Sequence, residues 1–269
     1  MKNVIFILIL ISYSLTTNAK DSLNFGVVPQ QSASELVKKW GPIFRYLEQE
    51  TGLKINFETA PDIPTFEARL AEGKYDLAYM NPYHYVVFSK DSGYKAFSKA
   101  RDKRIKGILV VRKDSEINEL KDLNNTTLAF PAPAAFAASI LTRAALTQDG
   151  VSFTPKYVSS HDSSYLTVAR GVYPAAGGVL RTLKTMPAEI QEQLKVLWIS
   201  KGYTPHAIAS HPRIPTSTVK KIQQALIRMD SSVNGKALLK MIKIKGFEAG
   251  QNDEWDDVRS LDLNFIKFD

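Results

Sequence analysis

The stretch YDLAYMNPYHY, residues 75–85, indicates how the whole chain folds. Its first half is short and apolar and lies between Gly73 and an Asn-Pro pair, a pattern typical of a buried strand that ends in a turn. Ligands of open α/β sheets bind just beyond the carboxyl ends of the strands. We therefore expect a ligand site at this strand end, with at least two of the rings of Tyr79, Tyr83 and Tyr85 facing a cleft. The candidate residues are Tyr79, Asn81, Tyr83 and Tyr85. The alternative is a turn with aromatic side chains packed beneath it.

Strands and helices alternate on the N-terminal side of this stretch. Leu23–Val28 and Lys54–Phe57 have the pattern of strands. Between them, Ser32 and Glu35 have the spacing of a capping box, which predicts a helix that begins near Ala33. A further helical pattern leads directly into the central strand. This alternation predicts βαβ units and a mostly parallel sheet.

The same alternation repeats in the second half of the chain. Thr127–Phe130 predicts a strand, which a Pro-Ala-Pro sequence breaks before a helix over Ala134–Leu146. We expect two α/β lobes, the first formed by residues 20–111 and 205–269 and the second by residues 112–204. Two adjacent crossings between the lobes would form a hinge, with a ligand cleft between the lobes.

Residues 1–19 have the pattern of a secretory signal peptide. Lys2 gives a positive start, an apolar run follows, and small residues precede a cleavage site after Ala19. The apolar run is shorter than the roughly 20 residues that span a bilayer, although an uncleaved anchor is the alternative. The chain has no cysteine, which excludes a lipid-modified N-terminal cysteine. We therefore expect a soluble monomer in a Gram-negative periplasm.

The chain is basic, with a formal net charge of +8. Its lysines and arginines are scattered along the predicted helices and do not form a run. Solvated helix faces account for most of them, so we expect no nucleic-acid partner. The balance of charge gives only a modest preference for an anionic ligand.

Motifs of the common enzyme classes are missing from the sequence. It contains no Gly-x-Ser-x-Gly elbow, no glycine-rich dinucleotide fingerprint, no phosphate-binding P-loop and no His-Glu-x-x-His. The four histidines lack metal-site spacing, and no two carboxylates pair as a general acid and base. We therefore expect the protein to be no enzyme and to bind neither metal nor cofactor.

The helix expected over Ala134–Leu146 follows its strand directly, so the free N–H groups of its first turn should point into the cleft. Helix N-termini bind anions through such groups. No hydroxyl occurs in this helix before Ser139, so an anion would rest on backbone N–H groups. The alternative is a helix start of small residues that packs tightly on the sheet.

Several segments resemble, in order and spacing, the phosphate/phosphite/phosphonate periplasmic binding proteins, which are substrate-binding components of ABC importers. These segments are residues 75–85, 128–146, 159–162, 168–178 and 205–212, and the resemblance covers nearly the whole mature chain. It implies the two-lobed type II periplasmic binding protein fold, with a two-crossing hinge. It also implies that Tyr79, Tyr85 and His161 lie at the ligand pocket.

The chain departs from that family where the family sets its ligand chemistry. Phosphonate binders typically open the second-lobe helix with Ser-Thr-Ser, whereas this chain has Ala135, Phe136 and Ala137. Members that bind aminoalkyl phosphonates hold the amine with acidic residues, and Arg181 stands near one of these places. We therefore expect an organic anion with apolar surface, with Arg181 as a fixed positive charge unless it lies on a solvated helix face. The candidate ligand-binding residues are Gln30, Tyr79, Asn81, Tyr83, Tyr85, Ala135, Phe136, Ala137, His161 and Arg181.

Three functions fit a hinged two-lobed protein, and the fold alone does not separate them. The leading interpretation is a periplasmic solute-binding protein that delivers a small anionic ligand to an ABC permease. The first alternative is a sensor subunit that presents its ligand to a membrane receptor such as a histidine kinase. The second is an enzyme, for which the sequence offers no set of catalytic residues.

Overall fold

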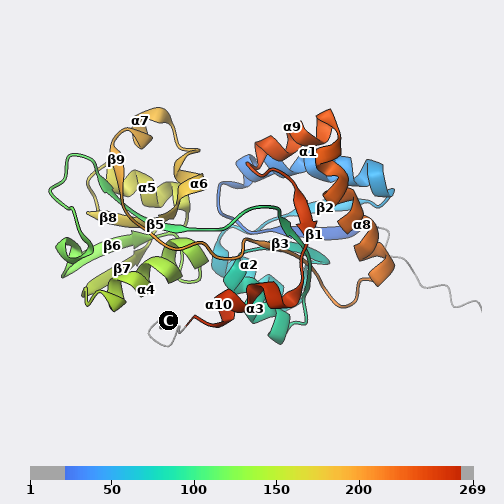
Figure 1. Ribbon diagram of the computed structural model, residues 1–269, viewed down its shortest axis with the longest axis horizontal. Coiled ribbons are helices and arrows are strands. Elements are labelled where there is room, and N and C mark those ends of the chain that lie inside the picture. The colour runs from blue at the N-terminus through green and yellow to red at the C-terminus, as the bar shows by residue number, and fades with distance from the viewer. Residues whose placement is uncertain (1–21, 262–269) are drawn as a thin grey trace, which may run out of the picture.

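Two helix-covered sheets form two lobes that lie side by side (Figure 1). The computed structural model describes residues 22–261, so the predicted signal peptide, residues 1–19, lies outside the described residues. Within residues 22–261 no helix is both long and apolar enough to cross a membrane. The predicted two-lobed α/β fold is confirmed.

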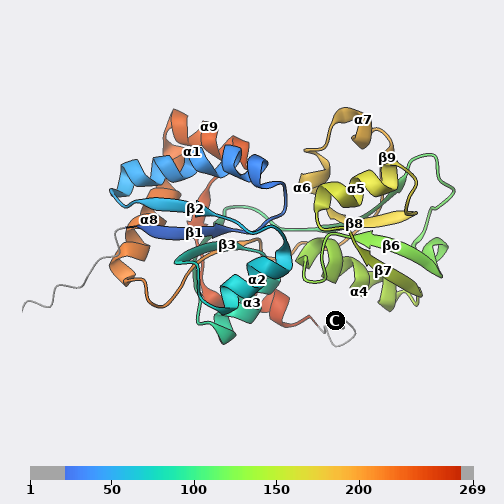
Figure 2. The same ribbon diagram turned by 180° about the vertical axis from the view of Figure 1, so that it is seen from behind.

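The first lobe is built on a six-stranded sheet. Its strands β1 to β4 run in one direction, and β10 and β11 run in the opposite direction. In spatial order the strands are β11 (Phe247–Ala249), β4 (Lys95–Ala100), β10 (Ala207–Ser210), β3 (Leu77–Met80), β1 (Leu23–Val27) and β2 (Ile55–Glu58). One face carries α1 (Ala33–Thr51), α8 (Thr216–Arg228) and α9 (Val233–Met241), and the other carries α2 (Ile63–Ala71), α3 (Pro82–Asp91) and α10 (Asp256–Arg259) (Figure 2).

Helix α1 shows how the local sequence builds this lobe. Its N-cap residue Ser32 accepts a hydrogen bond from the Glu35 N–H, as the capping-box spacing predicts. The helix runs through Pro42 without a break and ends at Gly52, whose φ of 66° is left-handed. Trp40 lies on its buried face, which is the apolar stripe of an amphipathic helix.

The second lobe is built on a five-stranded sheet. In spatial order its strands are β7 (Phe153–Tyr157), β6 (Thr126–Phe130), β8 (Ala175–Val179), β5 (Gly107–Arg112) and β9 (Leu194–Ile199). One face carries α5 (His161–Ala169), α6 (Leu180–Leu183) and α7 (Ala188–Gln191), and the other carries the π-helical turn η2 (Phe136–Ile140) and α4 (Leu141–Gln148). Side chains alternate along a strand, so successive residues of β5 lie on opposite faces of the sheet. Ile108 packs in the hydrophobic core on the α5 face, and Leu109 packs in the core on the α4 face.

The first crossing between the lobes lies earlier than expected. Gly107–Arg112 was expected to close the first lobe, but it forms β5 and pairs with β8 and β9 of the second sheet. In each sheet the first strand after a crossing, β5 or β10, runs antiparallel to both of its neighbours. A fully buried apolar run has no alternation that would assign it to either lobe, which is why the sequence placed the boundary about one strand too late.

The two crossings lie side by side and form a short antiparallel bridge. The Ile105 N–H donates to the Tyr203 carbonyl at 2.8 Å, and the Tyr203 N–H donates to the Ile105 carbonyl at 2.9 Å. The return crossing therefore lies where it was expected. Adjacent crossings are the arrangement that allows two lobes to move about one hinge.

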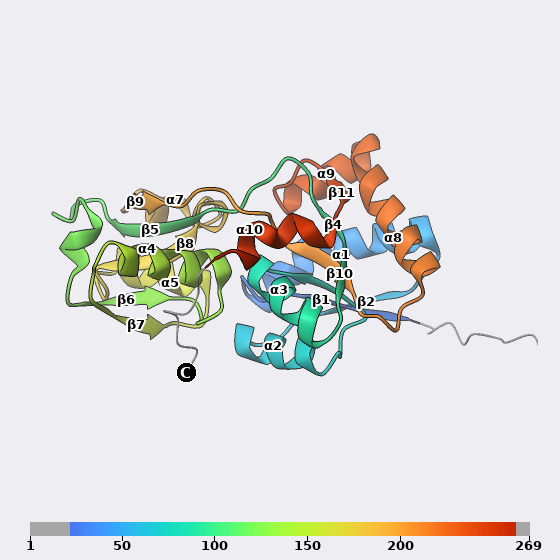
Figure 3. The same cartoon turned by 60° about the horizontal axis from the view of Figure 1, so that its bottom comes forward.

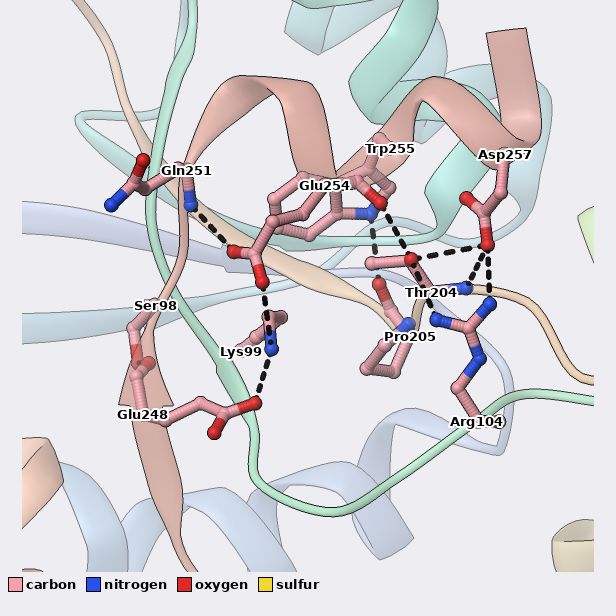
Figure 4. A network of polar contacts seen from close by, with 10 residues as sticks. All are labelled: Ser98, Lys99, Arg104, Thr204, Pro205, Glu248, Gln251, Glu254, Trp255 and Asp257. Carbon is pink, nitrogen blue, oxygen red and sulfur yellow. Dashed lines mark hydrogen bonds and ion pairs between the residues drawn. The ribbon is translucent and has the colours of Figure 1, made fainter. Parts of the chain in front are cut away.

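The C-terminal segment fastens these crossings to the first lobe. It comprises η4 (Asn252–Trp255) and α10, which lie beside α3 at the junction of the lobes (Figure 3). One oxygen of Asp257 accepts hydrogen bonds from the Arg104 guanidinium at 2.7 Å and from the Thr204 N–H at 2.8 Å (Figure 4). The Trp255 indole N–H donates to the Pro205 carbonyl at 2.9 Å. The return crossing is thus held by side chains about 50 residues further along the chain, and the first crossing by a side chain 153 residues further along.

Candidate functional site

The turn after β3 connects the two lobes directly. Asn81 is the N-cap of α3, and its Oδ1 accepts a hydrogen bond from the His84 N–H at 2.8 Å. Its Nδ2 donates to the Ala134 carbonyl of the second lobe at 3.0 Å. Asn81 is buried, so this bond is shielded from water. The strand end predicted from residues 75–85 therefore does lie at the junction between the lobes.

Tyr79 is the one tyrosine of this stretch that lines the cavities between the lobes. Its ring stacks on His206 with centroids 4.9 Å apart and packs against Trp40 at 4.7 Å. The expectation that at least two rings face the cleft is wrong for these cavities. The Tyr85 hydroxyl donates to Asn252 Oδ1 at 2.8 Å, on the side of the C-terminal segment, and Tyr83 packs against the core of the first lobe.

The reason is that residues 82–85 form the first turn of a helix and not a loop. Side chains in a helix turn by about 100° per residue, so they cannot all point at one edge of the sheet. The sequence carried a signal for this, because an Asn followed by Pro is a common N-cap and first helical residue. Asn81-Pro82 is such a pair, which we interpreted as a turn.

The helix of the second lobe begins in an unusual way at the junction. Its first turn, η2, is π-helical, and no acceptor for the N–H groups of Phe136, Ala137 and Ala138 is found among the described residues. The turn lies directly on two glycines of the sheet: a Cβ at Gly107 would stand 2.1 Å from the Ala137 carbonyl oxygen, and one at Gly177 would stand 1.8 Å from that of Ala138. The helix start therefore combines both sequence interpretations, free N–H groups and tight packing on the sheet.

A small cavity lies at this helix start, and we call it the helix-start cavity. Gln30, Asn81, Ala135, Phe136, Ala137 and His161 are among the residues that line it. Its volume is about 10 Å³, which corresponds to one water molecule. A larger ligand can enter only if the lobes separate.

Two buried histidines line the helix-start cavity. His161 Nδ1 and His206 Nε2 have no hydrogen-bond partner, although the two side chains are 2% and 4% exposed. Burial, followed by the charge of Arg181, lowers the pKa of His161 to about 4. For His206 too, burial is the largest cause and the charge of Arg181 the second, and its pKa lies well below the ordinary value. Both rings are therefore neutral near pH 7, and each offers a free nitrogen to a ligand.

Arg181 lies between the lobes and not on a solvated helix face. It comes from α6 of the second lobe, and its guanidinium donates to Gln30 Oε1 at 3.2 Å and to the Ile242 carbonyl at 3.3 Å, both in the first lobe. No carboxylate forms an ion pair with it in residues 22–261. An uncompensated guanidinium at a lobe junction is suited to a carboxylate or phosphonate, which it can bind through two parallel hydrogen bonds.

Sequence reasoning missed His206, Lys103 and Lys243, which also lie at the junction. All three are close in space to Arg181 but distant from it in the sequence. His206 carried a usable signal, because it directly precedes the strand that follows the return crossing. No group of three or more side chains suited to holding a metal ion occurs in the described part of the chain.

Comparison with known proteins gives the family. The sequence profile described as "ABC transporter, phosphonate, periplasmic substrate-binding protein" matches residues 25–255. The Phosphate-import protein PhnD of Mycolicibacterium smegmatis is 24% identical and aligned over 79% of this chain and 73% of its own length. The Phosphonates-binding periplasmic protein of Escherichia coli is also 24% identical, over 94% of this chain and 80% of its own length.

The fold is shared with solved structures of such proteins. The structure of PhnD1 from Prochlorococcus marinus in complex with methylphosphonate superposes with a TM-score of 0.82 at 18% identity, and the match covers 89% of this chain and 96% of that one. The family profile spans both lobes and both crossings. The chain therefore belongs to the family of periplasmic substrate-binding proteins of phosphonate ABC transporters.

Proposed function

We propose that this chain captures a small organic anion between its two lobes and delivers it to the membrane permease of an ABC importer. The observation that carries the proposal is Arg181, a guanidinium that reaches across the junction and bonds only to neutral acceptors among the described residues. The free N–H groups of η2 lie at the same junction and favour an anion. A monomer in the periplasm, released from its signal peptide, suits this role.

The helix start favours an anion that carries organic surface over free phosphate. Ala135, Phe136 and Ala137 supply no side-chain oxygen, and all three are buried. Phosphate needs each of its oxygens satisfied, because an unsatisfied polar group in a buried site costs several kcal/mol. An alkylphosphonate presents fewer oxygens and adds an apolar part that Phe136 can contact. Methylphosphonate, which is bound in the Prochlorococcus marinus protein, is the simplest such compound.

Calorimetry tests the proposal with phosphate, phosphite, methylphosphonate and short aliphatic and aromatic carboxylates. We expect organic anions to bind more tightly than phosphate, and Arg181→Gln to weaken them at least tenfold through loss of a charge-assisted hydrogen bond. Lys156→Met is the matched control, since it removes one positive charge from an exposed position on β7. Tight binding of inorganic phosphate that is unaffected by Arg181→Gln would overturn the proposal.

A further inference from the structure

A second, larger cavity lies on the hinge side of Tyr79 and His206, and we call it the basic cavity. Its volume is about 320 Å³, which is within the range of small-molecule sites. Ile105, Val179 and His206 line both this cavity and the helix-start cavity, so the two are neighbours. The basic cavity takes its name from six lining residues: Lys103, Arg104, Lys106, Arg181, Lys184 and Lys243.

Most of this positive charge is uncompensated. Arg104 is paired with Asp257, but the other five cations form no ion pair within the described residues. Two of them are held by backbone acceptors: the Lys103 ammonium donates to the Lys243 carbonyl at 2.7 Å, and the Lys243 ammonium donates to the Lys184 carbonyl at 3.2 Å. The backbone thus positions Lys103 and Lys243 while their charge stays available to a ligand.

Lys103 lies in an environment that disfavours its charged form. Burial, followed by the charges of Arg181 and Lys243, lowers the pKa of this lysine to about 8. A half-buried cation that lies near two others and forms no ion pair within residues 22–261 is electrostatically unfavourable. A bound anion would relieve this cost, and none of the described residues that line the basic cavity is a carboxylate.

His206 gives an independent indication that the cavity takes a ligand. Its side chain is 4% exposed, it lines the cavity, and its Nε2 has no partner. Buried polar atoms in native proteins are nearly always hydrogen-bonded, so an unpartnered one in a residue that lines a cavity indicates that a ligand atom completes it. Val179, Leu180 and Ile244 supply an apolar lining between the cations. The cavity therefore suits an organic group that ends in a negative charge.

We propose that the basic cavity is the second half of the ligand site and binds an anionic tail of the ligand whose head lies at the helix start. The ligand class is then an organic dianion, such as a phosphonate that carries a carboxylate at the far end of a short aliphatic chain. This inference rests on the proposed function, because the head must bind between the lobes. It predicts selectivity for tail charge, which the proposed function alone does not.

Three probes with the same head and chain length but different tails test the inference: phosphonopropionate, propylphosphonate and aminopropylphosphonate. We expect calorimetry to give about tenfold tighter binding for the carboxylate tail than for the neutral tail, the ratio that one charge-assisted hydrogen bond provides. The ammonium tail should bind more weakly than the neutral tail, because it adds a like charge beside the cations.

Variants locate the effect in the basic cavity. Lys103→Met and Lys184→Met should each reduce the advantage of phosphonopropionate over propylphosphonate, and continued binding of propylphosphonate shows that the variants are folded. Lys156→Met, the exposed control on β7, should keep the full advantage.

The possible results separate the two proposals. Equal binding of phosphonopropionate and propylphosphonate would overturn the inference and leave the proposed function intact. Tighter binding of aminopropylphosphonate would do the same. Binding of none of the three would overturn the inference, and it would overturn the proposed function as well if no organic anion of the first panel binds. An advantage of the carboxylate tail that persists in both lysine variants would place the tail elsewhere and overturn the inference.

Discussion

The two sides of the lobe junction differ in how their polar groups are used. On the cavity side, His161, His206 and Arg181 are left with free nitrogens or uncompensated charge. On the side of the C-terminal segment, one oxygen of Asp257 accepts bonds from both crossings, although its Oδ1 has no partner among the described residues, and the Trp255 indole is also bonded. Unpaired polar groups cost stability unless a ligand completes them. The cavity side therefore keeps polar groups available for a ligand, and the side of the C-terminal segment stabilises the junction that holds those groups in place.

The largest effect is expected on the C-terminal side. Trp255 is fully buried, and its ring packs against Tyr85 with centroids 4.7 Å apart. Trp255→Ala should cost about 3–5 kcal/mol of unfolding free energy through the cavity that it leaves. Urea denaturation measures this cost. Trp255→Phe, which keeps most of the ring but loses the bond to the Pro205 carbonyl, should cost about 1–3 kcal/mol.

If Trp255→Ala lowered the unfolding free energy only slightly, the comparison would be wrong, because the C-terminal segment would then not stabilise the junction. Ligand affinity per folded molecule should stay within about twofold in Trp255→Phe, since this side chain touches neither cavity.

The second effect belongs to the cavity side and depends on pH. The pKa of His161 is lowered from 6.5 to about 4 in the folded protein. Between these values the unfolded chain binds more protons than the folded one, so the contribution is intact above pH 6.5 and is lost as the pH falls to 4. At 1.36 kcal/mol per pH unit, the original protein should lose about 3 kcal/mol of unfolding free energy between pH 6.5 and pH 4 through His161. The His161→Gln variant lacks this titrating group, so its stability should fall by about 3 kcal/mol less. Urea denaturation of both proteins from pH 7 to pH 4 measures the difference, and carboxylates that titrate in both cancel. Parallel pH curves would contradict a buried neutral imidazole.

A smaller effect is expected where the turn after β3 joins the lobes. Asn81→Ala removes both the N-cap acceptor of α3 and the bond to the Ala134 carbonyl, and should cost about 1–2 kcal/mol. Asn81→Ser is the matched control, since its hydroxyl keeps a cap acceptor but is too short to reach the Ala134 carbonyl. If Asn81→Ala and Asn81→Ser are equally destabilised in thermal unfolding, the cost arises at the junction. If only Asn81→Ala is destabilised, the cost arises at the cap, and the bond between the lobes contributes little.

The smallest effect is expected for the ion pair that joins the first crossing to the C-terminal segment. The Arg104 side chain is 53% exposed and that of Asp257 is 28% exposed, so water screens their attraction. Asp257→Asn should cost about 0.5–1 kcal/mol, and less as salt is added. Asp256→Asn, at the exposed neighbouring position, is the control and should cost less still. A cost above that of Asn81→Ala would show that this exposed pair holds the hinge more firmly than the buried turn does.

Local signals in the sequence predicted most of the framework. Ser32 caps its helix as its position indicated, because a cap depends only on residues within one turn. The strands β4 and β11 were not predicted, since short strands with irregular burial carry no clear alternation. The lobe boundary was misplaced for a similar reason, because the buried run of β5 suits either sheet.

The candidate site was only partly predictable. Arg181 and His161 were recognised from local sequence and resemblance, and both lie at the junction. Tyr83 and Tyr85 were misassigned because the Asn-Pro pair begins a helix. Lys103 and Lys243 were missed because only the tertiary fold brings these distant segments together. No periodicity or motif records such a contact.

The bridge between the crossings also makes the hinge observable. The amide hydrogens of Ile105 and Tyr203 are donated to each other's carbonyls, so each exchanges with solvent only when this pair of bonds opens. If the crossings twist as one ribbon, both amides stay protected through every cycle of opening and closing. If the crossings separate, both amides exchange at the rate of lobe opening. Two backbone amides of the crossings would then report the rate at which the lobes open, without any label on a ligand.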